Sequence, residues 1–219
     1  MKIKVVLFDF IGTTVKEKDS SVITSCLSKA FQDHGIFLTS NFFIYNRGKN
    51  KLAIIKEVLE KYNLPLSTVP KINDSFTLNI KNSIRNFSAF DDSLFVFSYL
   101  LRIGILIWIG TGLSREIFDT IFSHLGWTKR AFSYIGFSEE VGKNRPEPDM
   151  IFDMLNKLEI RESKEILKVG DTIADIQEGK NAGCLTAVVL SGTQPEEELL
   201  LEKPDYILKS LDDLKTIIK

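Results

Sequence analysis

The chain has 219 residues, of which 44% are hydrophobic, so it is long enough to bury a core of ordinary size. Its formal net charge of −1 excludes the strongly basic surface that binding to nucleic acid requires. Its two cysteines form no disulfide framework, and no hydrophobic stretch approaches the roughly 20 residues of a membrane span. We therefore expect a cytoplasmic protein that has neither a membrane nor a nucleic-acid partner.

Short hydrophobic runs alternate with helical patterns along most of the chain. The runs that predict buried strands lie at 3–8, 104–109, 165–169 and 185–190. Hydrophobic residues at helical spacing predict helices near 91–102, 114–125, 147–157, 173–182 and 210–218. Strands separated by helices of this length are typical of parallel βαβ units, so the predicted fold is an α/β protein with a doubly wound parallel sheet.

The stretch from residue 17 to residue 88 breaks this alternation. It contains helical spacing without a convincing strand, in 22–37, 52–62 and 72–87. We interpret residues 17–88 as a small helical cap, inserted into a core made of residues 1–16 and 89–219. An insert directly after the first strand is well placed to act as a lid over a site at the edge of the sheet.

The first predicted strand ends in an acid and a turn, Asp9-Phe10-Ile11-Gly12-Thr13-Thr14. Open α/β sheets bind their ligands at the carboxyl ends of the strands. Asp9 is therefore a candidate nucleophile. Gly12 and Thr13 are candidates for supporting this loop and binding the substrate.

Three further motifs lie where predicted strands end or predicted helices begin. Thr111 and Gly112 follow a buried strand, with Gly112 a candidate for binding the substrate, and Arg145 precedes a helix. Asp171 and Asp175 lie at the end of another strand. Because all strand-to-helix loops of a parallel sheet open on the same edge, we expect these side chains to converge.

These residue types suit phosphoryl transfer to a carboxylate. The forked guanidinium of Arg145 can neutralise the oxygens of the transferred group, and Thr111 offers a hydroxyl and a backbone N–H. Clustered carboxylates repel one another unless a cation is present, and Mg²⁺ prefers oxygen ligands. The predicted Mg²⁺ ligands are the carboxylates of Asp9, Asp171 and Asp175 and the backbone carbonyl of Ile11.

The four motifs resemble, in their order and rough spacing, those of the haloacid dehalogenase-like hydrolases. Residues 170–183, Gly-Asp-Thr-x-x-Asp-x-x-x-Gly-x-x-Ala-Gly, carry much of this resemblance. The Gly-Thr-Thr turn after Asp9 and the sequence Arg-Pro-x-Pro from Arg145 look most like the phosphonoacetaldehyde hydrolase (phosphonatase) branch. The resemblance implies a Rossmann-like core with a helical cap, Mg²⁺, an aspartyl-phosphate intermediate and a small phosphorylated or phosphonate substrate.

One departure from the superfamily pattern bears on the mechanism. Its phosphatases carry a second Asp that protonates the leaving group and activates water, and here Ile11 takes that position. Phosphonatases also lack this acid and use a cap lysine that forms an imine with the aldehyde. Lys51 falls on that position, and we expect the charge of Lys49 to lower its pKa. Arg47, where that branch has Met, suits an anionic group, so Arg47 and Lys49 are predicted to bind substrate.

Alternative functions stay open at this point. One is an ordinary phosphomonoesterase, similar to phosphoglycolate phosphatases, that uses a different acid. Another is a non-catalytic relative that binds a phosphorylated ligand or a partner. A receiver-type signalling domain is disfavoured because receivers place the phosphate-accepting Asp at the end of their third strand, not their first. The expected oligomeric state is monomer or homodimer.

Overall fold

The computed structural model describes residues 2–158 and 162–218, and the predicted core range also includes residues 1, 159–161 and 219, which lie outside them. Within the described residues, a six-stranded parallel sheet has the order β5-β4-β1-β6-β7-β8. Its strands are β1 (Val5–Phe8), β4 (Leu106–Thr111), β5 (Tyr134–Phe137), β6 (Ile166–Gly170), β7 (Leu185–Val189) and β8 (Tyr206–Leu208). The predicted doubly wound α/β sheet is confirmed.

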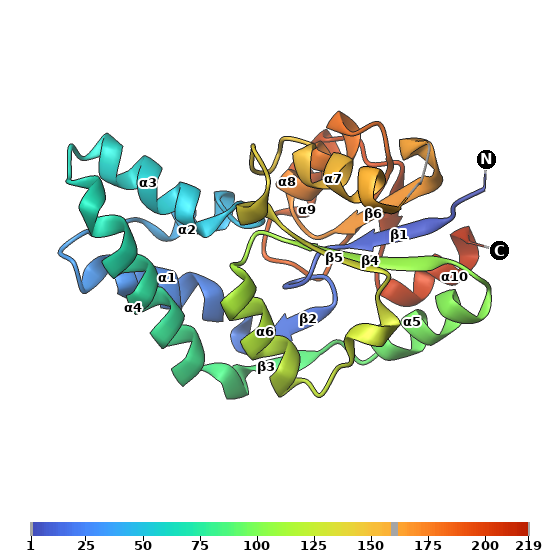
Figure 1. Ribbon diagram of the computed structural model, residues 1–219, viewed down its shortest axis with the longest axis horizontal. Coiled ribbons are helices and arrows are strands. Elements are labelled where there is room, and N and C mark those ends of the chain that lie inside the picture. The colour runs from blue at the N-terminus through green and yellow to red at the C-terminus, as the bar shows by residue number, and fades with distance from the viewer. Residues whose placement is uncertain (1, 159–161, 219) are drawn as a thin grey trace.

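Helices cover both faces of this sheet (Figure 1). One face carries α5 (Ser93–Arg102), α6 (Arg115–His124) and α10 (Leu214–Ile217). The other face carries α7 (Asp149–Leu158), α8 (Ile173–Asn181) and α9 (Glu196–Leu201). Each predicted core helix is present, although the last is shorter than the predicted 210–218 because a 3₁₀ turn precedes it.

The central strand β1 is buried on both faces, as its continuous hydrophobic run predicts. Leu7 packs in a cluster with Met150 of α7. Phe8 points to the opposite face, where its ring centroid lies 5.4 Å from that of Phe97 on α5. Burial on both faces fixes the register of β1, and therefore the position of the acid that follows it.

Further helices form a separate layer beyond the carboxyl ends of the strands (Figure 1). This helical insert consists of α1 (Val22–Gln32), α2 (Ser40–Tyr45), α3 (Lys51–Lys61) and α4 (Val69–Asn82). Its buried side chains include Phe31, Ile55 and Phe76. The helices agree with a cap, and the domain division at residues 17 and 88 stays a prediction. None of the helices in the described ranges is long and hydrophobic enough to cross a membrane.

Sequence patterns missed the shortest elements. The strands β5 and β8 were not predicted, and β8 is three residues long with Ile207 52% exposed. The predicted helix 72–87 was wrong beyond Asn82, where a turn leads into β3 (Phe87–Ala89). That strand pairs antiparallel with β2 (Val15–Glu17). Such short elements arise from pairing with distant neighbours, which a local hydrophobic period does not reveal.

Candidate active site

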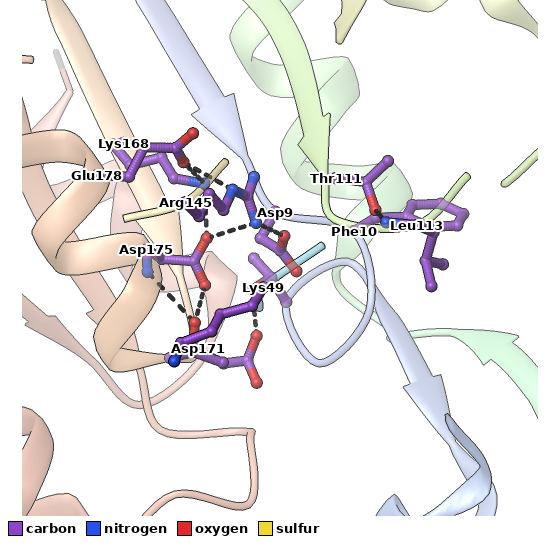
Figure 2. Close-up of polar contacts among 12 residues, drawn as sticks. Asp9, Phe10, Lys49, Thr111, Leu113, Arg145, Lys168, Asp171, Asp175 and Glu178 are labelled. Atoms are coloured by element: carbon purple, nitrogen blue, oxygen red, sulfur yellow. Dashed lines mark hydrogen bonds and ion pairs between the residues drawn. The ribbon is translucent and has the colours of Figure 1, made fainter. Parts of the chain in front are cut away.

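The candidate side chains converge at the carboxyl edge of the sheet. Asp9 follows β1, Thr111 ends β4, and Asp171 follows β6. Arg145 reaches the same place from the segment before α7 (Figure 2). Carboxylate oxygens of Asp9, Asp171 and Asp175 all lie within 4.8 Å of one another. The fold therefore brings together acids that are far apart in the sequence.

Arg145 lies between Asp9 and Asp175 (Figure 2). Its Nη1 donates to Asp9 Oδ1 at 2.5 Å and lies 3.1 Å from Asp175 Oδ1. Its Nε lies 2.8 Å from Glu178 Oε2. Burial acts to lower the pKa of this guanidinium, but the charges of Glu178, Asp175 and Asp9 raise it above the usual value. Arg145 therefore keeps a positive charge beside the candidate nucleophile.

A second buried cation, Lys168, was missed by sequence reasoning. Its Nζ lies 2.7 Å from Asp175 Oδ1 and 3.4 Å from Glu178 Oε2. Burial acts to raise the pKa of Asp175, but Lys168 and Arg145 hold it below the usual value. The signal was present, because Lys168 is a charged residue in the middle of the hydrophobic strand β6. Glu178 follows Asp175 by one helical turn and so shares its face of α8.

The charges of this buried cluster fit a divalent cation. The cluster has four carboxylates and two cations, namely Asp9, Asp171, Asp175, Glu178, Arg145 and Lys168. Two negative charges are therefore in excess, and buried charges require neutralisation. Burial, then the charge of Asp175, raises the pKa of Asp9 to about 6 despite Arg145. The carboxylates thus lack enough cationic partners from the protein itself.

Asp171 has the donor atom that such a cation needs. Its Oδ1 accepts a hydrogen bond from Thr13 Oγ1 at 3.0 Å, while its buried Oδ2 has no partner among residues 2–158 and 162–218. Burial, followed by the charges of Asp9 and Asp175, raises the pKa of Asp171 to about 8. Both oxygens of Asp175 already accept hydrogen bonds from protein groups. The donor set therefore fits direct binding by Asp9 and Asp171 and binding by Asp175 through water.

Gly12 and Thr13, predicted to bind substrate, lie against Asp171. Gly12 has a φ of +94°, and a Cβ built on it would lie 2.2 Å from Asp171 Oδ2. Thr13 orients the other oxygen of the same carboxylate. The turn after the nucleophile thus positions an acid of the cluster, and neither residue lines the adjoining cavity described below.

The Gly12→Ala variant tests this packing. We expect it to lose about 3 kcal/mol of stability, and its response to added Mg²⁺, because the new methyl group collides with Asp171. Gly35→Ala is the matched control, since Gly35 has a φ of +75° but open space around it. Its loss should be about 1 kcal/mol, from backbone strain alone. Denaturant unfolding with and without Mg²⁺ measures both, and equal losses would contradict the proposed contact.

A small cavity of about 30 Å³ opens beside the candidate nucleophile. Its lining comes from the core and from the helical insert: Asp9, Ile11, Ile23, Arg47, Gly48, Lys51, Thr111, Gly112 and Leu113. The predicted residues Thr111, Gly112, Arg47 and Lys51 are among them, whereas Ile23, Gly48 and Leu113 were missed. Gly112 marks a close approach of the core to the helical insert, because a Cβ there would lie 2.7 Å from the carbonyl oxygen of Gly48.

Lys51 is 8% exposed and lies at the start of α3. Its Nζ donates to the carbonyl oxygen of Lys49 at 2.8 Å. Burial, then the charge of Arg47, lowers the pKa of Lys51 to about 8. The predicted direction is therefore right, but the predicted cause was wrong, because Lys49 contributes its carbonyl and not its charge. The ammonium of Lys49 donates to Asn46 Oδ1, and Lys49 lines a neighbouring cleft of about 350 Å³ with Arg145.

Arg47 forms a buried ion pair with Glu17, which sequence reasoning missed. Glu17 Oε2 accepts from Arg47 Nη2, and Glu17 Oε1 accepts from the backbone N–H of Ile23 at 2.6 Å. Burial acts to lower the pKa of Arg47, but Glu17 and Asp171 raise it. Glu17 therefore holds a charged Arg47 at the wall of the cavity.

Removing one partner of this ion pair should lower the free energy of unfolding more than removing both partners. Glu17→Gln keeps the acceptor for Ile23 but leaves Arg47 unpaired, so we expect a loss of about 3 kcal/mol in the free energy of unfolding. In the double variant Glu17→Gln with Arg47→Met, most of this loss should be recovered. A double-mutant cycle by urea unfolding measures the coupling, and additive losses would show that the pair is not coupled.

Comparison with known proteins identifies the family to which this fold belongs. The family model described as haloacid dehalogenase-like hydrolase matches residues 6–189. The curated phosphonoacetaldehyde hydrolase of Bacteroides fragilis is 24% identical over 262 residues, covering 100% of this chain and 96% of that protein. A phosphonoacetaldehyde hydrolase-like protein from Oleispira antarctica superposes with a TM-score of 0.83 at 20% identity, covering 99% and 91% of the two chains. A predicted phosphoglycolate phosphatase from Haemophilus somnus gives 0.80 at 18% identity, covering 99% and 98%.

The chain belongs to the haloacid dehalogenase-like hydrolases, because the family model spans most of its length. It is therefore a hydrolase with this family's α/β core. Within the family, the similarity to phosphonoacetaldehyde hydrolases supports the phosphonatase-like branch predicted from the motifs.

Proposed function

We propose that the protein is a Mg²⁺-dependent hydrolase of a small phosphorylated or phosphonate metabolite, acting through an aspartyl-phosphate intermediate on Asp9. One observation carries this proposal. Asp9 accepts a hydrogen bond from the buried Arg145 and, together with Lys51 and Thr111, lines a small cavity between the core and the helical insert. A carboxylate nucleophile, a guanidinium and a hydroxyl supply what phosphoryl transfer requires.

The chain's own groups have distinct roles in this reaction. A carboxylate oxygen of Asp9 attacks phosphorus, and the bond to the leaving group breaks with its electron pair on the leaving atom. Arg145 neutralises charge on the transferred oxygens, and the hydroxyl of Thr111 can donate to one of them while it accepts from the N–H of Leu113 at 3.2 Å. Water then hydrolyses the aspartyl phosphate and frees the carboxylate.

A bound Mg²⁺, held by Asp9, Asp171 and the carbonyl of Ile11 and through water by Asp175, would supply charge neutralisation between nucleophile and phosphate. The unpaired Oδ2 of Asp171 and the excess negative charge of the cluster support this choice.

A phosphonate aldehyde is the substrate class that explains the missing second acid. Lys51 would form an imine with the aldehyde, and the imine would accept the electron pair when the carbon–phosphorus bond breaks. Its lowered pKa of about 8 leaves a usable fraction of neutral, nucleophilic amine at neutral pH. Ile11 supplies no proton, so the imine removes the need for an acid at that position.

A phosphomonoesterase is the second candidate. Arg47 in the cavity wall favours it, because a guanidinium there suits an anionic substrate group. In this case Lys51 would act as a charged substrate-binding group and would form no covalent bond.

Fluorine NMR of the protein with Mg²⁺ and beryllofluoride tests the shared part of both candidates. A bound aspartyl–beryllofluoride signal is expected, and it should vanish in Asp9→Asn. Turnover of phosphonoacetaldehyde beside simple phosphate esters then separates the two. The proposal is wrong if no adduct forms and no phosphorus compound is hydrolysed.

Stabilisation by Mg²⁺ should depend on pH. Since the folded pKa of Asp171 is raised to about 8 from its usual value near 4, the folded protein keeps this proton while the unfolded chain loses it, and without a cation this costs stability as pH rises from about 4 to about 8. Mg²⁺ removes that cost, so the increase in melting temperature on adding Mg²⁺ should grow from pH 5 to pH 8. Calorimetry at fixed ionic strength measures this increase in melting temperature. A shift independent of pH would contradict binding at Asp171.

A further inference from the structure

The loop between β7 and α9, residues 190–195, contacts the nucleophile turn and the acid cluster. Ser191 Oγ donates to the carbonyl oxygen of Gly12 at 2.6 Å. Gly192 lies so close to Asp171 that a Cβ built on it would be 2.3 Å from Asp171 Oδ2. This loop, which no motif had singled out, therefore packs directly against the candidate site.

One residue of this loop, Gln194, also reaches the helical insert. Its side-chain Oε1 accepts from the backbone N–H of Ile173 at 2.7 Å, and its Nε2 donates to the carbonyl oxygen of Ile44 at 3.0 Å. Gln194 is 7% exposed, so its amide is largely buried, and its partners Ile173 and Ile44 are half-buried. A primary amide is suited to this position because it is both a donor and an acceptor.

One hydrogen-bond partner of Gln194 belongs to the core and the other to the helical insert, and both lie close in sequence to residues of the candidate site. Ile173 is the first residue of α8 and lies midway between Asp171 and Asp175. Ile44 is in α2, and its carbonyl oxygen also accepts from the backbone N–H of Arg47 at 3.2 Å. A single side chain thus joins the helix that carries the acids to the turn that leads to Arg47 and Lys51.

Two further contacts lie at the same boundary between the helical insert and the core, which we call the seam. Gly48 packs on Thr172, where a Cβ built on the glycine would lie 2.4 Å from Thr172 Oγ1. At the exposed rim, the hydroxyl of Tyr45 donates to Glu198 Oε1 at 2.8 Å. Gln194 is 7% exposed and Tyr45 is 48% exposed, so loss of the Gln194 amide should matter more than loss of the rim contact.

We propose that Gln194 is a positioning residue that holds the helical insert closed over Asp9 and so sets Lys51 and Arg47 at the wall of the cavity. The structural part of this inference stands on the two hydrogen bonds. Its kinetic consequence rests on the proposed function. If the closed arrangement is only partly populated, substrate affinity falls by that fraction, while turnover at saturation changes little.

Hydrogen exchange of the whole protein tests the structural part. Gln194→Glu keeps an acceptor for Ile173 but loses the donor to Ile44. Exchange in residues 44–50 should become about tenfold faster, while residues 173–176 stay protected. Gln194→Leu loses both bonds, so both segments should exchange faster. Tyr45→Phe is the control at the rim and should change exchange in residues 44–50 by less than about twofold.

Unchanged exchange in residues 44–50 of Gln194→Glu would overturn the inference. Unchanged protection of β1 and β4 shows that a variant is folded. If Gln194→Leu fails to fold, Gln194→Glu still carries the test, because it retains the bond within the core.

Kinetics test the consequence for the reaction. With Mg²⁺ and whichever compound of the phosphonoacetaldehyde and phosphate-ester panel is hydrolysed, Gln194→Glu should raise KM about tenfold and change kcat by less than about threefold. A fall in kcat without a change in KM would contradict a positioning role. If the unmodified protein forms no beryllofluoride adduct and hydrolyses nothing, the proposed function fails, and the exchange result still decides whether Gln194 holds the seam.

Discussion

Replacing Asp9 with asparagine should lower turnover by at least ~10⁴-fold, because the amide cannot attack phosphorus to form the acyl phosphate. The change is nearly isosteric. Arg145 Nη1 can still donate to the remaining oxygen at this position, which preserves the packing of the buried cluster. Steady-state kinetics on the best substrate of the panel, with thermal unfolding in parallel, measures the effect.

The same substitution at Asp91 is the matched control. The side chain of Asp91 is 95% exposed and pairs with Lys16 at the surface, so Asp91→Asn should leave turnover within about twofold. If Asp9→Asn retains more than about a hundredth of the activity, the nucleophile is elsewhere.

Lys51→Arg should separate the two candidate reactions. Arginine keeps the positive charge but cannot form an imine under these conditions, because its guanidinium stays protonated. Cleavage of phosphonoacetaldehyde should therefore fall by at least ~10³-fold, while hydrolysis of a phosphate ester should stay within about tenfold. Lys56→Arg is the control on the same helix, since Lys56 is exposed and outside the cavity.

Borohydride trapping gives the same distinction by a direct chemical readout. With phosphonoacetaldehyde present, reduction should attach the substrate carbon to Lys51, as mass spectrometry of the digested protein can show. The pKa of about 8 leaves about a tenth of the amine neutral at pH 7, so trapping should increase between pH 6 and pH 8 and level off above that. Trapping on another lysine, or no trapping at all, would leave the phosphomonoesterase as the remaining candidate function.

Much of the fold was predictable because its signals are local. The hydrophobic run of β1 and the acid that ends it are consecutive in the chain. Burial of both faces of that strand requires hydrophobic residues at every position, and the sequence shows them. The long helices of the helical insert were predictable for the same reason, since they repeat their hydrophobic residues at helical spacing. The short strand β8 has no such repeat, and it forms because it pairs with its neighbour β7.

Some residues of the candidate site could likewise be predicted from the sequence, and others could not. Asp9, Arg145 and Asp171 were predictable from motifs that lie at the ends of predicted elements. Glu17 and Gln194 were not, because their partners lie 30 and 150 residues away and no local pattern marks them.

The sequence by itself determined the nucleophile candidate, the missing acid at Ile11 and the class of hydrolase, since each depends on residue type and order along a strand and its turn. Only the tertiary structure decided that Arg145 pairs with Asp9 across 136 residues, and that burial beside Arg47 lowers the pKa of Lys51. The physical reason is that hydrogen bonds and desolvation depend on which atoms are neighbours in space. The pairing of strands and the packing of the helical insert against the core determine which atoms are neighbours, and the local sequence does not.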